Sequence, residues 1–254
     1  MYAPLKLPIV HVSVRSSEMT KYASNDFLAL KISYINEIAN FCEIVGADIE
    51  EVARGMGMDR RIGSNFLKAG IGYGGSCFPK DTKALNFQSD HAGVKLKTVK
   101  ATIDVNREQR TRLIDKARRF FPTFRDVRVA IIGLTFKPGT DDLREAPAKQ
   151  NIDILLNEGA DIIAWDPLGV ENFRKRYPNC AINFAKDIDE ALTDADVCLI
   201  MTEWEKIVEY PLDNYKKYMK RPLVFDGRNC YKLSEAEKHE IFYDSIGRKI
   251  VDTL

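Results

Sequence analysis

The sequence has 254 residues, of which 45% are apolar, so the chain is long enough to build one large or two ordinary hydrophobic cores. With 38 basic and 37 acidic residues, it lacks the cationic excess expected of a protein that binds nucleic acid or an anionic membrane surface. No apolar run approaches the roughly 20 residues of a membrane span. The five cysteines show no CxxC spacing, which favours reduced thiols in a soluble, cytoplasmic protein.

The first half of the chain shows helical patterns only. Residues 1–14 are expected to form an extended lead-in segment. A long helix should follow, because apolar residues recur there at steps of three and four. Asp48 begins a capping-box pattern and so marks the start of a second helix. The helices are expected at residues 16–46, 48–57, 66–68 and, as one long or broken helix, from residue 82 to about 120.

From residue 123 onward, short β-branched runs alternate with helical segments. This alternation predicts a Rossmann-like, doubly wound parallel sheet, in which ligands lie beyond the carboxyl ends of the strands. The strands are expected at residues 127–134, 161–165, 181–184, 197–201 and 223–226, and the helices at 148–157, 173–177, 188–192 and 208–219. We therefore expect an α/β protein of two domains, a helical one at residues 1–122 and a Rossmann-like one at residues 123–254.

A glycine-rich stretch, FLKAGIGYGGSCFPKD, occupies residues 66–81. Glycines tolerate positive φ and close approach, so such a loop can wrap round a ligand. The stretch contains Cys77, with Lys80 and Asp81 beside it. A lysine favours a thiolate and a carboxylate can move protons, so Cys77 is a candidate nucleophile. The alternative is an ordinary exposed cysteine.

The letters GIGYGG at residues 70–75 fit the pattern GxGxxG, but they do not predict a dinucleotide site. That fingerprint follows a strand and opens a helix, whereas here a helix precedes it and Cys-Phe-Pro follows. The loop after the strand at 127–134 lacks the second close glycine. Lys137 and Arg228 each follow a predicted strand, where they could hold a diphosphate or be solvated surface cations.

The other polar residues give weaker signals. Lys21 and Asn25 are four residues apart and share one face of the first helix, which by itself is typical of surface positions. The three histidines are scattered, so no metal site is expected. An unrelated cysteine hydrolase is disfavoured, because no histidine lies near Cys77 to act as its base.

Five strings carry a resemblance to a known family. They are TKYASNDFLALKISYINEIANFCE (residues 20–43), GMDRRIGSNFLKAGIG (57–72), GYGGSCFPKD (72–81), GLTFKPGTDDLRE (133–145) and FDGRN (225–229). In this order they resemble the nucleotide-sugar 6-dehydrogenases of the UDP-glucose/GDP-mannose dehydrogenase family. The letters RRIG, FLKAGIGYGG and FDGRN favour the branch that acts on UDP-glucose over those for UDP-N-acetylmannosamine or GDP-mannose.

The resemblance implies a helical central domain, a UDP-binding domain and an NAD-dependent reaction. In that reaction the C6 alcohol of UDP-glucose is oxidised to the carboxylate of UDP-glucuronate with two NAD+. Cys77 would attack the aldehyde, and the resulting thiohemiacetal would be oxidised to a thioester. Lys21 and Asn25 would stabilise the oxyanion and position the hydroxyl or water. Asp81 would assist proton transfer through water.

The resemblance also implies which residues bind the ligands. The substrate would be held by Phe66, Leu67, Lys68, Gly70, Tyr73, Gly74, Phe136, Lys137 and Arg228. Arg61 would reach the site of a neighbouring subunit, in a homodimer built on the helical domain. Lys80 and Arg144 would contact the cofactor.

One part of the family pattern is not found in this sequence. Members of the family begin with an NAD-binding Rossmann domain, and this chain opens at what matches the join after it. The chain is therefore expected to be a truncated portion that does not turn over alone, because the cofactor performs the hydride chemistry. A non-catalytic module for nucleotide-sugar binding or dimerisation is the alternative from a different class.

Overall fold

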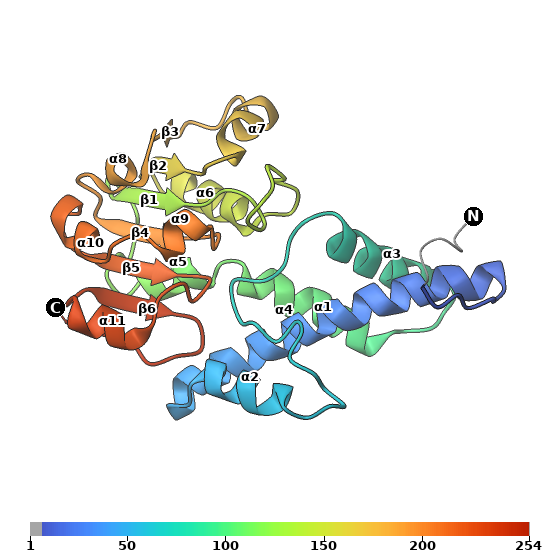
Figure 1. Ribbon diagram of the computed structural model, residues 1–254. Helices are drawn as coiled ribbons and strands as arrows, with labels where there is room; N and C mark the ends of the chain where they lie inside the picture. The colour runs from blue at the N-terminus through green and yellow to red at the C-terminus, as the bar shows by residue number, and fades with distance from the viewer. Residues whose placement is uncertain (1–6, 254) are drawn as a thin grey trace.

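The computed structural model describes residues 7–253, and its amino-terminal part is helical (Figure 1). The long helix α1 begins after Ser13, whose side chain accepts a hydrogen bond from the Ser16 amide, and ends at Gly46 in the left-handed conformation. The helices of this part are α1 (Val14–Val45), α2 (Ile49–Gly57), α3 (Cys77–His91), α4 (Lys97–Gln109) and α5 (Arg112–Ala117). The two helices expected first are thus confirmed, while residues 1–6 of the expected lead-in segment lie outside the described residues.

The second part is an α/β sheet that is parallel throughout. Its strands are β1 (Arg128–Ile132), β2 (Asp161–Trp165), β3 (Asn183–Phe184), β4 (Val197–Ile200), β5 (Leu223–Asp226) and β6 (Phe242–Ser245), in the order β3-β2-β1-β4-β5-β6. The helices around it are α6 (Pro147–Asn157), α7 (Gly169–Arg176), α8 (Ile188–Leu192), α9 (Glu205–Val208), α10 (Asp213–Tyr218) and α11 (Leu233–Lys238). The strand order reverses between β1 and β4, where doubly wound sheets bind ligands.

The expected α/β class is confirmed, and the central strands are buried on both faces as parallel sheets require. Two apolar clusters cover these faces. One joins Ile35 and Ile71 of the helical part to Val129 and Phe225 of the sheet. A single core therefore runs from the helical part into the sheet. The helix expected beyond residue 82 is broken, because Gly93 adopts φ 74° between α3 and α4.

Three details of the expected secondary structure are wrong. No helix forms over residues 66–68, because Phe66 has φ 65°, which an α-helix does not allow. The helix expected at 208–219 is divided into α9 and α10, because Pro211 cannot donate a backbone hydrogen bond. The strand β6 was not expected at all, since its four residues, FYDS, contain a central aspartate instead of an apolar run.

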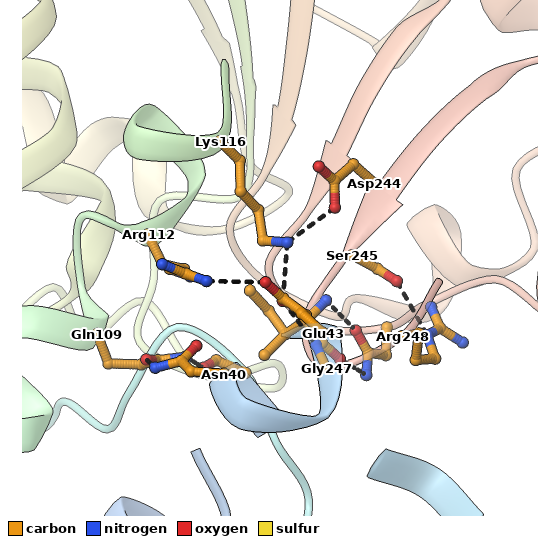
Figure 2. Close-up of polar contacts among 12 residues, drawn as sticks. Asn40, Glu43, Gln109, Arg112, Lys116, Asp244, Ser245, Gly247 and Arg248 are labelled. Atoms are coloured by element: carbon orange, nitrogen blue, oxygen red, sulfur yellow. Dashed lines mark hydrogen bonds and ion pairs between the residues drawn. The ribbon is translucent and has the colours of Figure 1, made fainter. Parts of the chain in front are cut away.

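An ionic cluster fastens α1 to the sheet (Figure 2). Glu43, near the end of α1, accepts hydrogen bonds from Arg112 and from the Gly247 amide, and its carboxylate lies 2.7 Å from Lys116 Nζ. The same ammonium group donates to Asp244 of β6 at 2.8 Å. Glu43, Arg112, Lys116 and Asp244 are called the joint cluster below. It ties the carboxyl end of α1 to β6 through α5.

Three general features complete the description of residues 7–253. None of the helices there combines the length and the apolar character that a membrane crossing would need. No group of three or more His, Cys, Asp or Glu side chains in this part of the chain gathers as metal ligands would. All five cysteines are free thiols.

Candidate active site

Amide side chains of the neighbouring helices form hydrogen bonds with the backbone of the glycine-rich loop. Asn36 of α1 accepts from the Gly70 amide at 2.8 Å, and Gln109 of α4 donates to the Gly70 carbonyl at 2.8 Å. Asn106 accepts from the Tyr73 amide at 2.8 Å and donates to the Tyr73 carbonyl at 3.2 Å. The loop backbone thus finds partners without a helix or a strand, and is fixed in place before any ligand arrives.

Two glycines in the loop are required by close contacts. Gly72 has φ 84°, and a Cβ there would lie 2.6 Å from Asn106 Oδ1. Gly75 has φ 79°, and a Cβ there would lie 2.9 Å from the Phe136 ring. Side chains at these positions would displace the groups that shape the loop.

The buried carboxylate of Asp81 gathers three donors beside the loop. Lys21 Nζ and Asn25 Nδ2, both on α1, lie 2.8 and 2.5 Å from Asp81 Oδ2, and Lys80 donates to Oδ1. Burial alone would raise the pKa of the Asp81 carboxyl, but hydrogen bonds from Lys21, Lys80 and Asn25 outweigh it and lower that pKa to about 2. Lys21, Asn25, Lys80 and Asp81 are called the loop cluster below. Spacing along the sequence alone made Lys21 and Asn25 typical surface residues, whereas the structure places them on a buried acid.

A second acid, Asp26, lies in the same region and was not expected. It is 7% exposed, and neither of its carboxylate oxygens has a hydrogen-bond partner within residues 7–253. Burial, with repulsion from Asp81 as a smaller contribution, raises the pKa of the Asp26 carboxyl to about 6. Its buried face of α1 also carries Ser33 and Asn36, so the sequence pattern does not single Asp26 out.

Cys77 is the first residue of α3, and its thiol is exposed. The sulfur therefore lies at the positive end of the helix dipole. It lines a cavity of about 370 Å³ together with residues from the loop that follows β1: Phe136, Lys137, Thr140, Asp142 and Arg144. The thiol is thus reachable from solvent and faces the second half of the molecule.

A second cavity, of about 310 Å³, adjoins the first. Both cavities are lined by Gly74, Phe78, Phe136 and Lys137. The second one adds Ile32, Phe66, Lys68, Ala69, Gly72, Tyr73, Glu203 and Arg228. One continuous surface therefore runs from Cys77 to Arg228, across the contact between the helical part and the sheet.

Three cations line this second cavity: Lys68, Lys137 and Arg228. Arg228 is positioned by hydrogen bonds from Nε to the Met201 carbonyl at 2.9 Å and from Nη1 to the Gly72 carbonyl at 3.1 Å. Its Nη2 is buried and has no hydrogen-bond partner within the described residues. A forked donor held in this way suits the oxygens of a phosphate or carboxylate.

The structure brings together most of the residues predicted for the site. Phe66, Lys68, Tyr73, Gly74, Phe136, Lys137 and Arg228 line the second cavity, and Cys77 and Arg144 line the first. Leu67 belongs to the core at 4% exposure, and a Cβ on Gly70 would lie 2.8 Å from the Gly227 carbonyl, so these two shape the loop from behind.

Five other predicted residues line neither cavity: Lys21, Asn25, Asp81, Lys80 and Arg61. Arg61 is exposed and forms an ion pair with Asp59 at 2.6 Å, so it does not reach either cavity of its own chain. Lys80 is bonded to Asp81 and lines neither cavity. Phe78, which sequence reasoning missed, also lines the second cavity. Glu203 follows β4, where polar residues beyond a strand are expected to meet ligands; it lines the same cavity and lies 3.4 Å from Arg228.

The sheet does not offer the usual dinucleotide site. Dinucleotide-binding sheets use an acidic side chain downstream of the first βα turn to bind the ribose. The acid available here is Asp166, which follows β2 and is 4% exposed. Its two oxygens already accept hydrogen bonds from Leu134 N, Thr135 N, Thr135 Oγ1, Leu168 N, Gly169 N and Trp204 Nε1. The carboxylate therefore serves the fold.

Comparison with known families defines the class of protein. Residues 15–108 match the UDP-glucose/GDP-mannose dehydrogenase family, central domain, and residues 130–233 match the UDP binding domain of the same family. The chain therefore belongs to the UDP-glucose/GDP-mannose dehydrogenase family, and it contains the central and UDP-binding domains.

Individual relatives show how much of a family member the chain spans. The chain is 49% identical over 251 residues to a UDP-glucose 6-dehydrogenase of Bacillus subtilis and 44% identical over 252 residues to one of Rhizobium meliloti. These matches cover 99% and 98% of this chain and 57% of each relative. A UDP-glucose dehydrogenase structure from Pyrobaculum islandicum superposes with a TM-score of 0.88 at 31% identity, covering 98% of this chain and 55% of the other. The chain thus spans somewhat more than half the length of the relatives it matches.

Proposed function

We propose that the two adjoining cavities form the UDP-glucose site of an NAD-dependent UDP-glucose 6-dehydrogenase, which produces UDP-glucuronate. The main support for this proposal is the continuous surface from Cys77 to Arg228, which is lined by residues of both the helical part and the sheet. Lys137 and Arg228 would hold the diphosphate, and the loop with Tyr73 and Gly74 would cover the sugar and nucleotide. The sugar C6 would then lie towards Cys77.

The chemistry proposed at Cys77 begins once the C6 alcohol has become an aldehyde. The thiolate adds to the aldehyde carbon, which forms a C–S bond and a thiohemiacetal alkoxide. Loss of hydride from that carbon gives a thioester, and water then breaks the C–S bond to release the carboxylate and the thiol. The intermediate stays attached to Cys77, so the aldehyde does not escape.

The loop cluster would serve this chemistry from the helical side. Lys21 and Lys80 have side chains that are 62% exposed although Asp81 is buried, so their ammonium groups remain open to a ligand. Lys21 and Asn25 would stabilise negative charge on the sugar oxygen, and Asp81 would move a proton through water. The aspartate also holds both donors at fixed positions.

NAD+ is the proposed electron acceptor, and it would supply the hydride acceptance that both oxidation steps need. Arg144 lines the Cys77 cavity and has a side chain that is 53% exposed, so it can meet an anionic group there. Lys80 would add a second positive charge near the same opening. The saturated Asp166 argues against the sheet of this chain as the seat of the dinucleotide.

A homodimer built on the helical part is proposed as the assembly. Arg61 is exposed and does not reach the cavities of its own chain, so it is free to approach the site of a neighbour. The exposed apolar side chains Phe27, Tyr34 and Phe41 lie along one helix, α1.

Free thiols at all five cysteines agree with the reducing cytoplasm in which we place the protein.

Calorimetric titration of this chain with UDP and with UDP-glucose tests the proposal. We expect saturable binding of both, which Arg228→Ala weakens at least about tenfold because a charged bidentate contact is lost. Lys249→Ala, which removes an exposed lysine paired with Glu237, is the matched control and should leave the affinity unchanged. Absence of binding by the folded wild type would refute the site. Formation of NADH from UDP-glucose would then be assayed for turnover.

A further inference from the structure

Glu203 places an acid in a cavity that otherwise gathers cations. Within residues 7–253 it is the only acidic side chain that lines the second cavity, beside the three cations named above. Its Oε2 atom lies 3.4 Å from Arg228 Nε, which donates its hydrogen bond to the Met201 carbonyl instead. The carboxylate accepts no hydrogen bond from this part of the chain, and its side chain is 25% exposed. Because a carboxylate can only accept, the cavity contains an acceptor that calls for a donor.

The sheet explains how Glu203 comes to lie between two of these cations. Lys137, Glu203 and Arg228 follow β1, β4 and β5, which are neighbours in the sheet in that order. The three strands are parallel, so their carboxyl ends open on the same edge, where the strand order reverses. Dinucleotide-binding sheets use an acid beyond a strand to bind ribose hydroxyls. Asp166, which follows β2, is already saturated by the fold, whereas Glu203 is not.

Arg228 does not need Glu203 to hold it in place. Its Nε and Nη1 atoms donate to the carbonyls of Met201 and Gly72 at 2.9 and 3.1 Å. A negative charge 3.4 Å from the guanidinium also weakens the attraction that Arg228 exerts on a phosphate. Glu203 therefore opposes the binding of a bare diphosphate, and it favours a ligand only where that ligand donates hydrogen bonds to it.

A nucleoside diphosphate carries such donors next to its phosphates. Its ribose lies between the base and the diphosphate, and it has two adjacent hydroxyl groups. The cavity offers the base an aromatic wall, formed by Phe66, Tyr73 and Phe78. The cations Lys137 and Arg228 suit the diphosphate, which leaves the ribose for the acid beside them.

We propose that Glu203 accepts hydrogen bonds from the two ribose hydroxyls, so that the site selects ribonucleoside diphosphates over their deoxy analogues. The inference rests on the proposed function, because it assigns a role within the same nucleotide-sugar site. One carboxylate has enough lone pairs to accept from both hydroxyls. Glu203 is thus a specificity-determining residue, which touches the nucleotide and takes no part in the oxidation at Cys77.

Calorimetric titration with three probes tests the inference: UDP, 2′,3′-dideoxy-UDP and inorganic pyrophosphate. The wild type should bind UDP at least about tenfold more tightly than dideoxy-UDP, because hydrogen bonds to a charged group are lost with the hydroxyls. In Glu203→Ala this preference should fall below about threefold. Pyrophosphate should bind the variant at least as tightly as the wild type, because a repelling charge is removed, and this binding also shows that the cavity is intact.

Glu205→Ala is the matched control, because it removes an exposed acid that lies close to Glu203 in the chain but lines neither cavity. It should keep the wild-type preference for UDP. A Glu203→Ala variant that retains the full preference overturns the inference. Equal tightening of all three probes also overturns it, and leaves Glu203 as a counter-charge to Arg228. A wild type that binds UDP without preferring it to dideoxy-UDP overturns this inference alone, whereas absence of UDP binding overturns the proposed function as well.

Discussion

The two ends of α1 carry lysine–carboxylate contacts of opposite character. In the joint cluster, Lys116 is 8% exposed and lies between Glu43 and Asp244, whose side chains are 14% and 2% exposed. In the loop cluster, Asp81 is fully buried while its two lysines are 62% exposed. In the joint cluster the buried opposite charges pair with one another. In the loop cluster the ammonium groups are exposed and remain available to a ligand.

This difference shows how one type of contact can serve either the fold or the chemistry. A buried ion pair stabilises mainly by avoiding an uncompensated charge, so its loss damages folding. An exposed lysine on a buried acid adds little to stability, but its charge is held at a fixed place. Burial of the cation, more than the presence of the pair, therefore separates the structural cluster from the candidate active site.

The largest effect is expected from the joint cluster. Lys116→Met leaves Glu43 and Asp244 buried with less compensation, so the free energy of unfolding should fall by about 3–5 kcal/mol. Chemical denaturation followed by circular dichroism measures this change. Lys249→Met, which removes an exposed pair with Glu237, should cost less than about 1 kcal/mol. Equal losses in the two variants would abolish the distinction between the two kinds of cluster.

The next effect is on the shape of the loop. Gly72→Ala should weaken UDP binding at least about tenfold, because its Cβ would press on Asn106 and move the loop backbone. Gly139→Ala is a close control: Gly139 also has positive φ, 76°, but a Cβ there would meet no atom of the described residues within 4 Å. Calorimetry that finds equal affinities for both variants would show that backbone strain, and not the contact with Asn106, matters.

The smallest effect concerns the pH dependence of stability in the loop cluster. The pKa of Asp81 is lowered to about 2, below its ordinary value of 3.8, so the carboxylate contributes stability above about pH 4 that is lost as pH falls through about 2. The wild type should therefore exceed Asp81→Asn in unfolding free energy near neutral pH, with a difference that narrows as pH falls between these two values. A difference that is constant with pH would place the stabilisation outside the ionised carboxylate.

The fold followed from the sequence wherever periodicity and burial agree. The runs at 161–165 and 223–226 are buried strands, and the long stripe of α1 is a helix, as predicted. β6 was not predicted because Asp244 interrupts its apolar pattern; in the structure this charge is compensated by Lys116 and Arg119, which lie more than 100 residues earlier in the chain. The helix predicted over residues 66–68 does not form, because side chains of α1 and α4 hold the adjoining loop in a non-helical conformation.

The candidate site could be predicted in its residues but not in its connections. Spacing placed Lys21 and Asn25 on one face of a helix, yet the contact of Lys21 with Asp81 spans 60 positions of the chain and depends on how α1 packs on α3. Asp26, whose carboxylate has no hydrogen-bond partner within residues 7–253, belongs to no sequence motif. Long-range packing, which sequence periodicity does not encode, decides both.

The most direct test of the composite site is the alkylation of Cys77 by iodoacetamide in the presence of UDP-glucose, followed by mass spectrometry. Cys180, which is partly exposed and lines neither cavity, serves as the internal reference. Saturating UDP-glucose should slow the alkylation of Cys77 at least about tenfold and leave Cys180 unchanged, because the sugar would cover the thiol. Binding of UDP-glucose with no protection of Cys77 would contradict the account and leave a module that binds the nucleotide sugar without acting on it.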